Sequence, residues 1–417
     1  LKGLRINMTE KMTLFGKQKE YEAADVLCHG NKIDDKTTAA LVSILKIAEQ
    51  YRLCGNIYKS YIAWLLIHDE NPYSLSCEMN NAENGGLRRF ALLDAQYLYD
   101  MYNAEIPNEI ADMLGDFTYT NDFGCENMTD IGNMANELAN RLDSTSSAEQ
   151  FLQAVTQFYC NNGVGMLGLN KAFYIDSTES TKLVPISDFD RYHLTDMWGY
   201  EHQKKLLTDN TEAFINGKAA NNVLLYGDSG TGKSTSIKAI LNEYHTRGLR
   251  MIEVYKHQFS CLPRLIEKLR LRRYSFIIYM DDLSFEEFEI EYKFLKAIIE
   301  GGLEKKPDNV LIYATSNRRH LIRESFSDRD GNDDIHKNDT VQEKLSLSDR
   351  FGLTISFTKP MQKEYLEIVK YLAHNAGINM PEDALCAEAS RWGLMHGGVS
   401  GRVARQFINH LLGAQDE

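Results

Sequence analysis

Gly227-Asp228-Ser229-Gly230-Thr231-Gly232-Lys233-Ser234 is the stretch that decides the fold, because it satisfies the pattern G-x-x-x-x-G-K-[ST]. It directly follows the apolar run 223–226, which predicts a strand, and a helix is expected to open at Lys233. A strand, a glycine-rich turn and a helix in this order are the context that a phosphate-binding loop requires. We therefore predict a nucleoside triphosphate site here, and the alternative is a chance glycine-rich turn.

The chemistry of this loop follows from its residue types. Its glycines allow successive backbone N–H groups to point at phosphate oxygens, and the helix start adds the positive end of its dipole. Lys233 is predicted to reach the β- and γ-phosphates, Ser234 to hold Mg²⁺, and Thr235 to cap the helix or line the α-phosphate side. The predicted nucleotide-binding residues are Gly227, Asp228, Ser229, Gly230, Thr231, Gly232, Lys233, Ser234 and Thr235.

Apolar runs alternate with helical segments after the loop. The predicted strands are 249–254, 275–280, 310–314 and 353–357. Runs that are apolar on both faces indicate a parallel sheet covered by helices, so the predicted fold class is α/β. Ligands bind such sheets at the carboxyl ends of the strands. The residues that follow each run are therefore the candidates for a functional site.

Polar side chains follow two of these runs. Asp281 is predicted to hold Mg²⁺ together with Ser234, directly or through water, and Asp282 is the candidate base for a lytic water. A simple helix N-cap is the alternative for this acidic pair. Asn317 follows the next strand, where its amide could orient water against the γ-phosphate, although a capping role is equally compatible with its position.

Two arginines complete the candidate catalytic set. Arg350 precedes the last predicted strand and suits a charge donated across a subunit boundary to a neighbour's γ-phosphate, which predicts a homo-oligomer. Arg402 follows a run of glycines at a helix start, where a small lid could reach back to the nucleotide. Read alone, each is more often a surface arginine. Their order after a phosphate loop favours the functional interpretation.

The chain before the loop has a different pattern. Apolar residues recur at helical spacing from about 37 to 103, whereas 104–145 is polar and is predicted to be a surface connection before a helix that starts near Ser146. The carboxylates Asp69, Glu70 and Glu78 are interpreted as part of a polar loop rather than a metal site. The G-x-G-x-x-G match at 163–168 is rejected as a dinucleotide site because a helix precedes it. A strand is expected at 172–175, and the boundary between halves near 180–195.

Composition sets the broad class. The 417 residues, 43% of them hydrophobic, are enough for two or three domains. The charge is 46 minus 59, or −13, so any site for a polyanion must be a local basic patch. Seven scattered cysteines argue against a disulfide framework, and the absence of a long apolar run or a leader pattern predicts a cytoplasmic protein that does not engage a membrane.

Taken in order, these motifs resemble those of the AAA+ ATPases. The resemblance implies a P-loop AAA+ parallel-sheet sandwich with a C-terminal helical lid, preceded by a mainly helical N-terminal domain, with ATP and Mg²⁺ as cofactors. The implied domains are 1–190, 191–358 and 359–417. It also implies that Gly199 and Tyr200 pack on adenine. More narrowly, stretches such as 281–285 and 344–352 are similar to a bacterial family catalogued only as a domain of unknown function.

One departure from the AAA+ pattern leaves the function open. Most AAA+ proteins carry Asp-Glu where this chain has Asp281-Asp282, which shortens the reach of the base by one methylene. The first hypothesis is an ATPase that moves a macromolecular partner, of unknown identity, at a subunit interface. The second is an ATP-gated adaptor with little hydrolysis. A third is a nucleic-acid loader that uses basic patches at 318–319 or 270–273.

Overall fold

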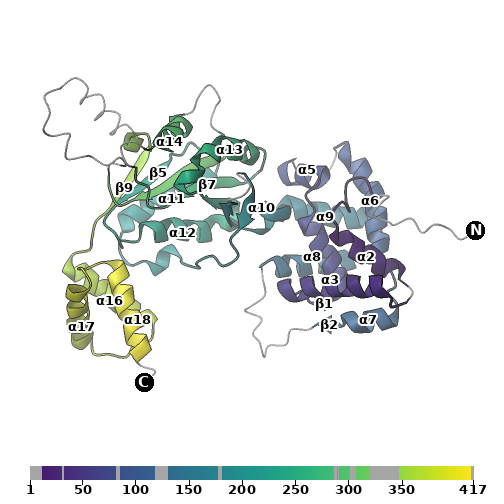
Figure 1. The fold of residues 1–417 in the computed structure, drawn as a ribbon, viewed down its shortest axis with the longest axis horizontal. Coiled ribbons are helices and arrows are strands. Elements are labelled where there is room, and N and C mark those ends of the chain that lie inside the picture. The colour runs from purple at the N-terminus through teal and green to yellow at the C-terminus, as the bar shows by residue number, and fades with distance from the viewer. Residues whose placement is uncertain are drawn as a thin grey trace, which may run out of the picture. The chain divides into compact units, whose positions relative to one another are not determined.

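The structure is a computed structural model that describes residues 12–30, 32–80, 85–117, 130–176, 181–285, 289, 291–300, 307–319, 321 and 347–414. It divides into two compact units, Leu1–Asn170 and Lys171–Glu417 (Figure 1). The division lies before the boundary expected at 190–191. The reason is that the strands at 172–175 and 183–185 pair into the sheet of the second unit.

The first unit is mainly helical. Its hydrophobic core is centred on α4, of which Ile62, Leu65 and Leu66 are fully buried. Asn56 caps this helix by accepting a hydrogen bond from the Lys59 backbone N–H, as expected of an N-cap asparagine. A short antiparallel pair joins β1 (Gly55–Asn56) to β2 (Asp116–Phe117). The helices are α2 (Glu20–His29), α3 (Asp35–Tyr51), α4 (Ile57–His68), α5 (Pro72–Asn80), α6 (Leu87–Tyr102), α7 (Asn108–Leu114), α8 (Asp130–Asp143), α9 (Ala148–Asn162) and α10 (Gly165–Leu169).

Two predictions for this unit were wrong. The polar stretch 104–145 is not only a surface connection, because α8 buries Leu138 and Leu142 against α4 despite its many polar residues. The interpretation of Asp69, Glu70 and Glu78 as one polar loop is wrong for Glu78, which lies on α5, whereas Asp69 does follow α4 in a loop. Asp69 and Glu78 are both buried, at 2% and 3% exposure. Asp69 accepts a hydrogen bond from the Tyr21 hydroxyl, and Glu78 accepts one from a backbone N–H. Among the described residues, no group of three or more His, Cys, Asp or Glu could hold a metal.

The second unit is built on a seven-stranded sheet. All neighbouring strands are parallel except the pair β3–β4. The strand order is β4-β3-β6-β7-β8-β5-β9. The six predicted strands after residue 170 are confirmed, with ends that agree within two residues. The strands are β3 (Ala172–Ile175), β4 (Leu183–Pro185), β5 (Val223–Gly227), β6 (Leu249–Glu253), β7 (Ser275–Met280), β8 (Val310–Ser316) and β9 (Leu353–Phe357).

Helices cover this sheet. On one face, Ile237 and Ile240 of α12 pack with Leu225 of β5 in a shared core. The helices associated with the sheet are α11 (Glu201–Ile215), α12 (Lys233–Tyr244), α13 (Leu262–Arg270) and α14 (Glu291–Glu300), with short 3-10 helices η3 (Leu194–Asp196), η4 (His245–Arg247) and η5 (Lys256–Cys261). This arrangement confirms the predicted α/β fold class.

The C-terminal helices form a group with its own core. The buried side chains of Tyr365, Ala389 and Phe407 bring together α16 (Gln362–Asn375), α17 (Glu382–Met395) and α18 (Gly401–Ala414). Figure 1 shows this group beyond the end of β9. We refer to α16–α18 as the lid. Within the described ranges, none of the helices combines the length and the apolar character needed to cross a bilayer.

Candidate functional site

The loop at 227–234 leaves β5 through a backbone that only glycine fits. Gly227 has φ +132°, and a Cβ placed on it would lie 2.0 Å from the backbone oxygen of Phe357 on the neighbouring strand β9. Gly230 and Gly232 also have positive φ, the latter at the N-cap of α12. The loop is therefore held against β9 while its helix begins at Lys233, as a phosphate-binding loop requires.

Lys233 is folded back onto the loop. Its Nζ donates to the backbone oxygens of Gly227 and Asp228 at 2.8 and 2.6 Å, and to Oδ1 of Asn317 at 3.2 Å. Burial lowers the pKa of Lys233, although the carboxylates of Asp228 and Asp282 oppose this shift. Lys233 is only 6% exposed as a residue. A buried ammonium group held by neutral oxygens has much to gain from an anionic ligand.

The first carboxylate of the acidic pair lies beside the start of α12. Oδ1 of Asp281 accepts hydrogen bonds from Ser234 Oγ at 2.7 Å and from Thr315 Oγ1 at 2.6 Å. Burial by itself raises the pKa of Asp281, but these hydrogen bonds outweigh it and leave the pKa below its usual value. A hydroxyl and an ionised carboxylate side by side are the oxygen ligands that Mg²⁺ prefers, so the residues fit that cation.

The second carboxylate is held in an uncommon backbone conformation. Asp282 has φ +49°, which few residues other than glycine adopt and which is frequent at functional sites. Its backbone N–H donates to Thr315 Oγ1 at 2.9 Å, and its Oδ1 accepts from Nδ2 of Asn317 at 2.7 Å. Because Asn317 also accepts from Lys233, one amide connects the candidate base to the phosphate loop.

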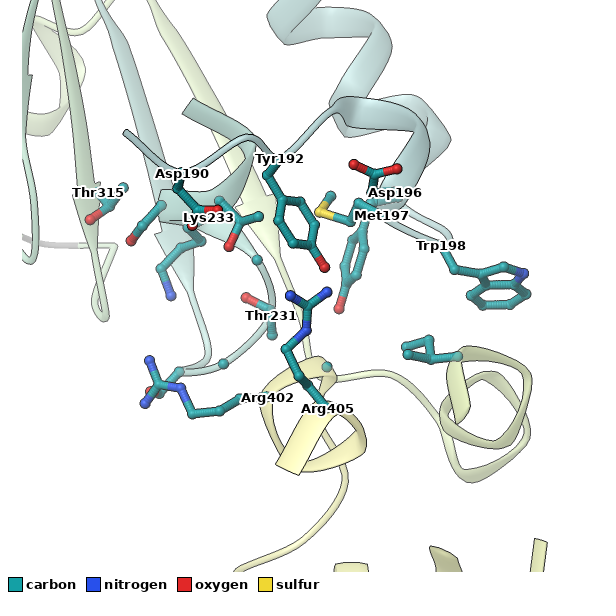
Figure 2. A pocket seen from close by; sticks show the side chains of 18 of the residues that line it. Asp190, Tyr192, Asp196, Met197, Trp198, Thr231, Lys233, Thr315, Arg402 and Arg405 are labelled. Atoms are coloured by element: carbon teal, nitrogen blue, oxygen red, sulfur yellow. The ribbon is translucent and has the colours of Figure 1, made fainter. Parts of the chain in front are cut away.

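These groups open onto one cavity of about 550 Å³ (Figure 2). We call its two halves the phosphate end and the open end. The phosphate end is lined by residues 229–235 with Asp281, Asp282, Thr315, Asn317 and Arg402. The open end is lined by Asp190, Tyr192, Asp196, Met197, Trp198, Tyr200, Ile368, Tyr371, Leu372 and Arg405.

The open end is formed by the 190–198 segment and the lid. Nδ2 of Asn242 on α12 donates to the backbone oxygens of Asp190 and Tyr192, which fixes one side of the segment. From the lid, the Arg405 guanidinium lies 4.3 Å from the centroid of the Tyr192 ring. Figure 2 shows this arginine extending from the lid toward that ring. The lid thus contributes to the wall of the cavity as well as to its phosphate end.

The predicted site residues fall into two sets. Those that line the cavity are Tyr200, Ser229, Gly230, Thr231, Gly232, Lys233, Ser234, Thr235, Asp281, Asp282, Asn317 and Arg402. Those that do not are Gly199, Gly227, Asp228 and Arg350. Gly227 and Asp228 instead anchor the loop to β9. Arg350 precedes β9, on the side of the strands' amino ends, whereas the phosphate loop follows the carboxyl end of β5.

Sequence reasoning missed part of the open end. Asp190 and Tyr192 lie where the sequence predicted only a domain boundary, and no role was predicted for Arg405. The aromatic residues at 189–198 could have indicated a binding surface, because a segment that only connects two domains does not require aromatic side chains. The role of Thr315, which bonds to both acidic residues of the pair, was also not predicted.

The sheet, the phosphate loop at the carboxyl end of β5, the polar residues after β7 and β8, and the helical lid together define the AAA+ class of P-loop proteins. The particular family follows from the sequence: the chain belongs to the family described as "Protein of unknown function (DUF815)", whose model matches residues 169–415. This confirms the predicted resemblance. A search of curated proteins found no match to the chain.

Solved structures show similarity at low identity. The RuvB Holliday junction branch migration motor of Thermotoga maritima is 18% identical, with a TM-score of 0.36, over 53% of this chain and 64% of that one. The AAA domain of FIGL-1, in complex with ADP, is also 18% identical, with a TM-score of 0.37, over 53% of this chain and 73% of that one. This chain therefore spans less than two thirds of the RuvB chain. The fold assignment rests on the sheet and the family match.

Proposed function

We propose that this protein is a Mg²⁺-dependent ATPase whose hydrolysis of ATP, at an interface between copies of the chain, moves a macromolecular partner. The observation that supports this most strongly is the convergence of Lys233, Ser234 and Asp281 in one cavity. They provide a cation for the phosphates and two oxygen ligands for the metal. The phosphate-binding loop and the AAA+ fold make ATP the expected nucleotide.

Each residue then has a defined task. Lys233 exchanges its backbone acceptors for the β- and γ-phosphates, while Ser234 and Asp281 hold Mg²⁺. The bound metal neutralises charge on the phosphates. Asp282 accepts the proton of the attacking water, and Asn317, which already donates to Asp282, orients that water. Arg402 reaches the γ-phosphate from the lid.

The proposal includes a homo-oligomer. Arg350 does not line the cavity of its own chain, and in the proposed assembly its guanidinium enters the cavity of a neighbouring copy. A guanidinium supplied in this way stabilises the charge of the transition state. Arg350→Ala should therefore keep nucleotide binding but lose turnover.

Nucleotide binding and hydrolysis should separate by residue. Lys233→Ala should weaken ATP binding by at least about 100-fold, because a buried cation in contact with phosphate is lost. Asp282→Asn should bind ATP as the wild type does and lose most of its turnover. Calorimetry with Mg²⁺·ATP and a steady-state phosphate-release assay measure the two properties. Equal affinity for ATP in wild type and Lys233→Ala would contradict the proposal.

A specific contact favours a second candidate, an ATP-gated switch with little hydrolysis. Asp282 is one methylene shorter than a glutamate and is held by Asn317 in a left-handed backbone conformation. Turnover below roughly one per minute, against about 1 to 1,000 per second for typical enzymes, would support the switch. Asp282→Glu provides a second test. It should raise turnover if the short side chain of Asp282 is the only feature that limits its access to the attacking water.

A further inference from the structure

Two tyrosines on neighbouring strands form a matched pair. Tyr279 of β7 lies directly opposite Tyr313 of β8 in the register of the sheet, and both belong to the same core under α12. Both are almost completely buried, at 3% and 0% exposure. The main difference between the two tyrosines is therefore in the hydrogen-bond partners of their hydroxyl groups.

The hydroxyl of Tyr313 is satisfied. It shares a hydrogen bond of 2.8 Å with Thr211 Oγ1 and accepts one of 3.1 Å from Nδ2 of Asn210. The buried hydroxyl of Tyr279, in contrast, has no hydrogen-bond partner in the part of the chain that the structure describes. A buried hydroxyl without a partner costs about 1–3 kcal/mol, so a residue of this kind needs a reason.

The surroundings of the Tyr279 hydroxyl supply that reason. Tyr279 lies two residues before Asp281, which directly follows β7, and the two side chains are close enough to interact. The Asp281 carboxylate and the Ser234 hydroxyl are polar side chains that act on the Tyr279 hydroxyl, which carries its proton at neutral pH as tyrosine ordinarily does. The hydrogen bonds that Asp281 accepts from Ser234 and Thr315 both end on Oδ1.

We infer that Tyr279 is a positioning residue of the cation site, whose hydroxyl donates to the Asp281 carboxylate when the cation binds Ser234 and Asp281. The inference rests on the proposed function, because it needs Mg²⁺ to bind there with the nucleotide. Hydrogen bonds to the outer oxygens of metal ligands fix their orientation, and their loss typically costs 10- to 100-fold in metal affinity. Without the cation, the unpaired Tyr279 hydroxyl destabilises the fold. When the cation binds, the hydrogen bond of this hydroxyl to Asp281 restores that stability.

Tyr279→Phe in the full chain tests this without using turnover. The free concentration of Mn²⁺, read by electron paramagnetic resonance, gives the cation affinity of the protein with ADP. This affinity should fall by about tenfold or more in Tyr279→Phe. The affinity for ADP measured in EDTA should stay within about twofold. Without nucleotide, the midpoint of thermal unfolding should be equal to or higher than that of the wild type.

Tyr313→Phe is the matched control. It removes one hydrogen bond from each of Asn210 and Thr211, so its unfolding midpoint should fall while its Mn²⁺ affinity stays unchanged. An unchanged Mn²⁺ affinity in Tyr279→Phe, or an equal loss of ADP affinity in EDTA, would overturn the inference. A wild type that binds ADP but shows no cation site would overturn it as well. A wild type that binds no nucleotide would instead refute the proposed function and, with it, the inference.

Discussion

The two ends of the cavity are built in different ways. At the phosphate end, the key groups lie within one loop or directly after a strand, and hydrogen bonds shorter than 3 Å join Ser234 and Thr315 to Asp281. At the open end, side chains of the lid meet the 190–198 segment, as when the Tyr371 hydroxyl donates to the Thr195 oxygen across 176 residues of sequence. Apart from Arg402, which the lid contributes, the phosphate end is fixed by the sheet, whereas the open end depends on the position of the lid.

The largest expected effect is at the phosphate end. Gly227→Ala should destabilise the protein by about 2–4 kcal/mol, because its Cβ would meet the Phe357 backbone, which cannot move without breaking the β5–β9 pairing. Denaturant unfolding followed by circular dichroism measures the change in the free energy of unfolding.

Gly248→Ala separates this clash from simple backbone strain. Gly248 also has a positive φ, +91°, but a Cβ placed on it meets nothing within 4 Å. Its substitution should cost only about 1–2 kcal/mol. If both variants lost the same stability, the close contact with β9 would not be what fixes the loop.

An intermediate effect is expected at the open end. If the ring of Tyr192 packs on the base of the nucleotide, Tyr192→Ala should weaken ATP binding about tenfold, which corresponds to the usual stacking contribution of about 1–3 kcal/mol. Binding of inorganic tripolyphosphate, which has no base, should change by less than about twofold. Competition against a fluorescent nucleotide measures both ligands.

Tyr192→Phe is the control for this prediction, since it keeps the ring that faces Arg405. Its affinity for ATP should stay close to that of the wild type. An equal loss of ATP and tripolyphosphate binding in Tyr192→Ala would mean that the ring supports the cavity as a whole rather than the open end.

The smallest effect is expected where the lid meets the 190–198 segment. Tyr371→Phe removes the hydrogen bond to the Thr195 oxygen and should cost at most about 1 kcal/mol, because the contact is accessible to water. Amide hydrogen exchange at 194–198 should become faster, with little change elsewhere. Tyr365→Phe breaks a hydrogen bond inside the lid instead, so it should leave exchange at 194–198 unaltered.

Prediction from the sequence succeeded where the signal is local. The strand at 275–280 has the predicted ends, because a run that is buried on both faces is apolar throughout and stops at the first charged residue. Prediction failed for α8, because its few buried apolar residues are separated by Asn, Glu and Asp, which obscure the helical pattern. That helix is stabilised by the surface of α4, which lies far from it in the sequence.

The sequence by itself determined the phosphate loop and the polar residues at the strand ends. Their positions relative to the strands follow from spacing of a few residues, and the parallel pairing of β5, β7 and β8 brings them together at the carboxyl ends of the strands. Only the tertiary structure decided that Tyr192 meets Arg405. It alone also decided that the Tyr313 hydroxyl has hydrogen-bond partners while that of Tyr279 has none among the described residues. The physical reason is that such pairings depend on how helices and lid pack across long stretches of chain, which no local pattern of residues specifies.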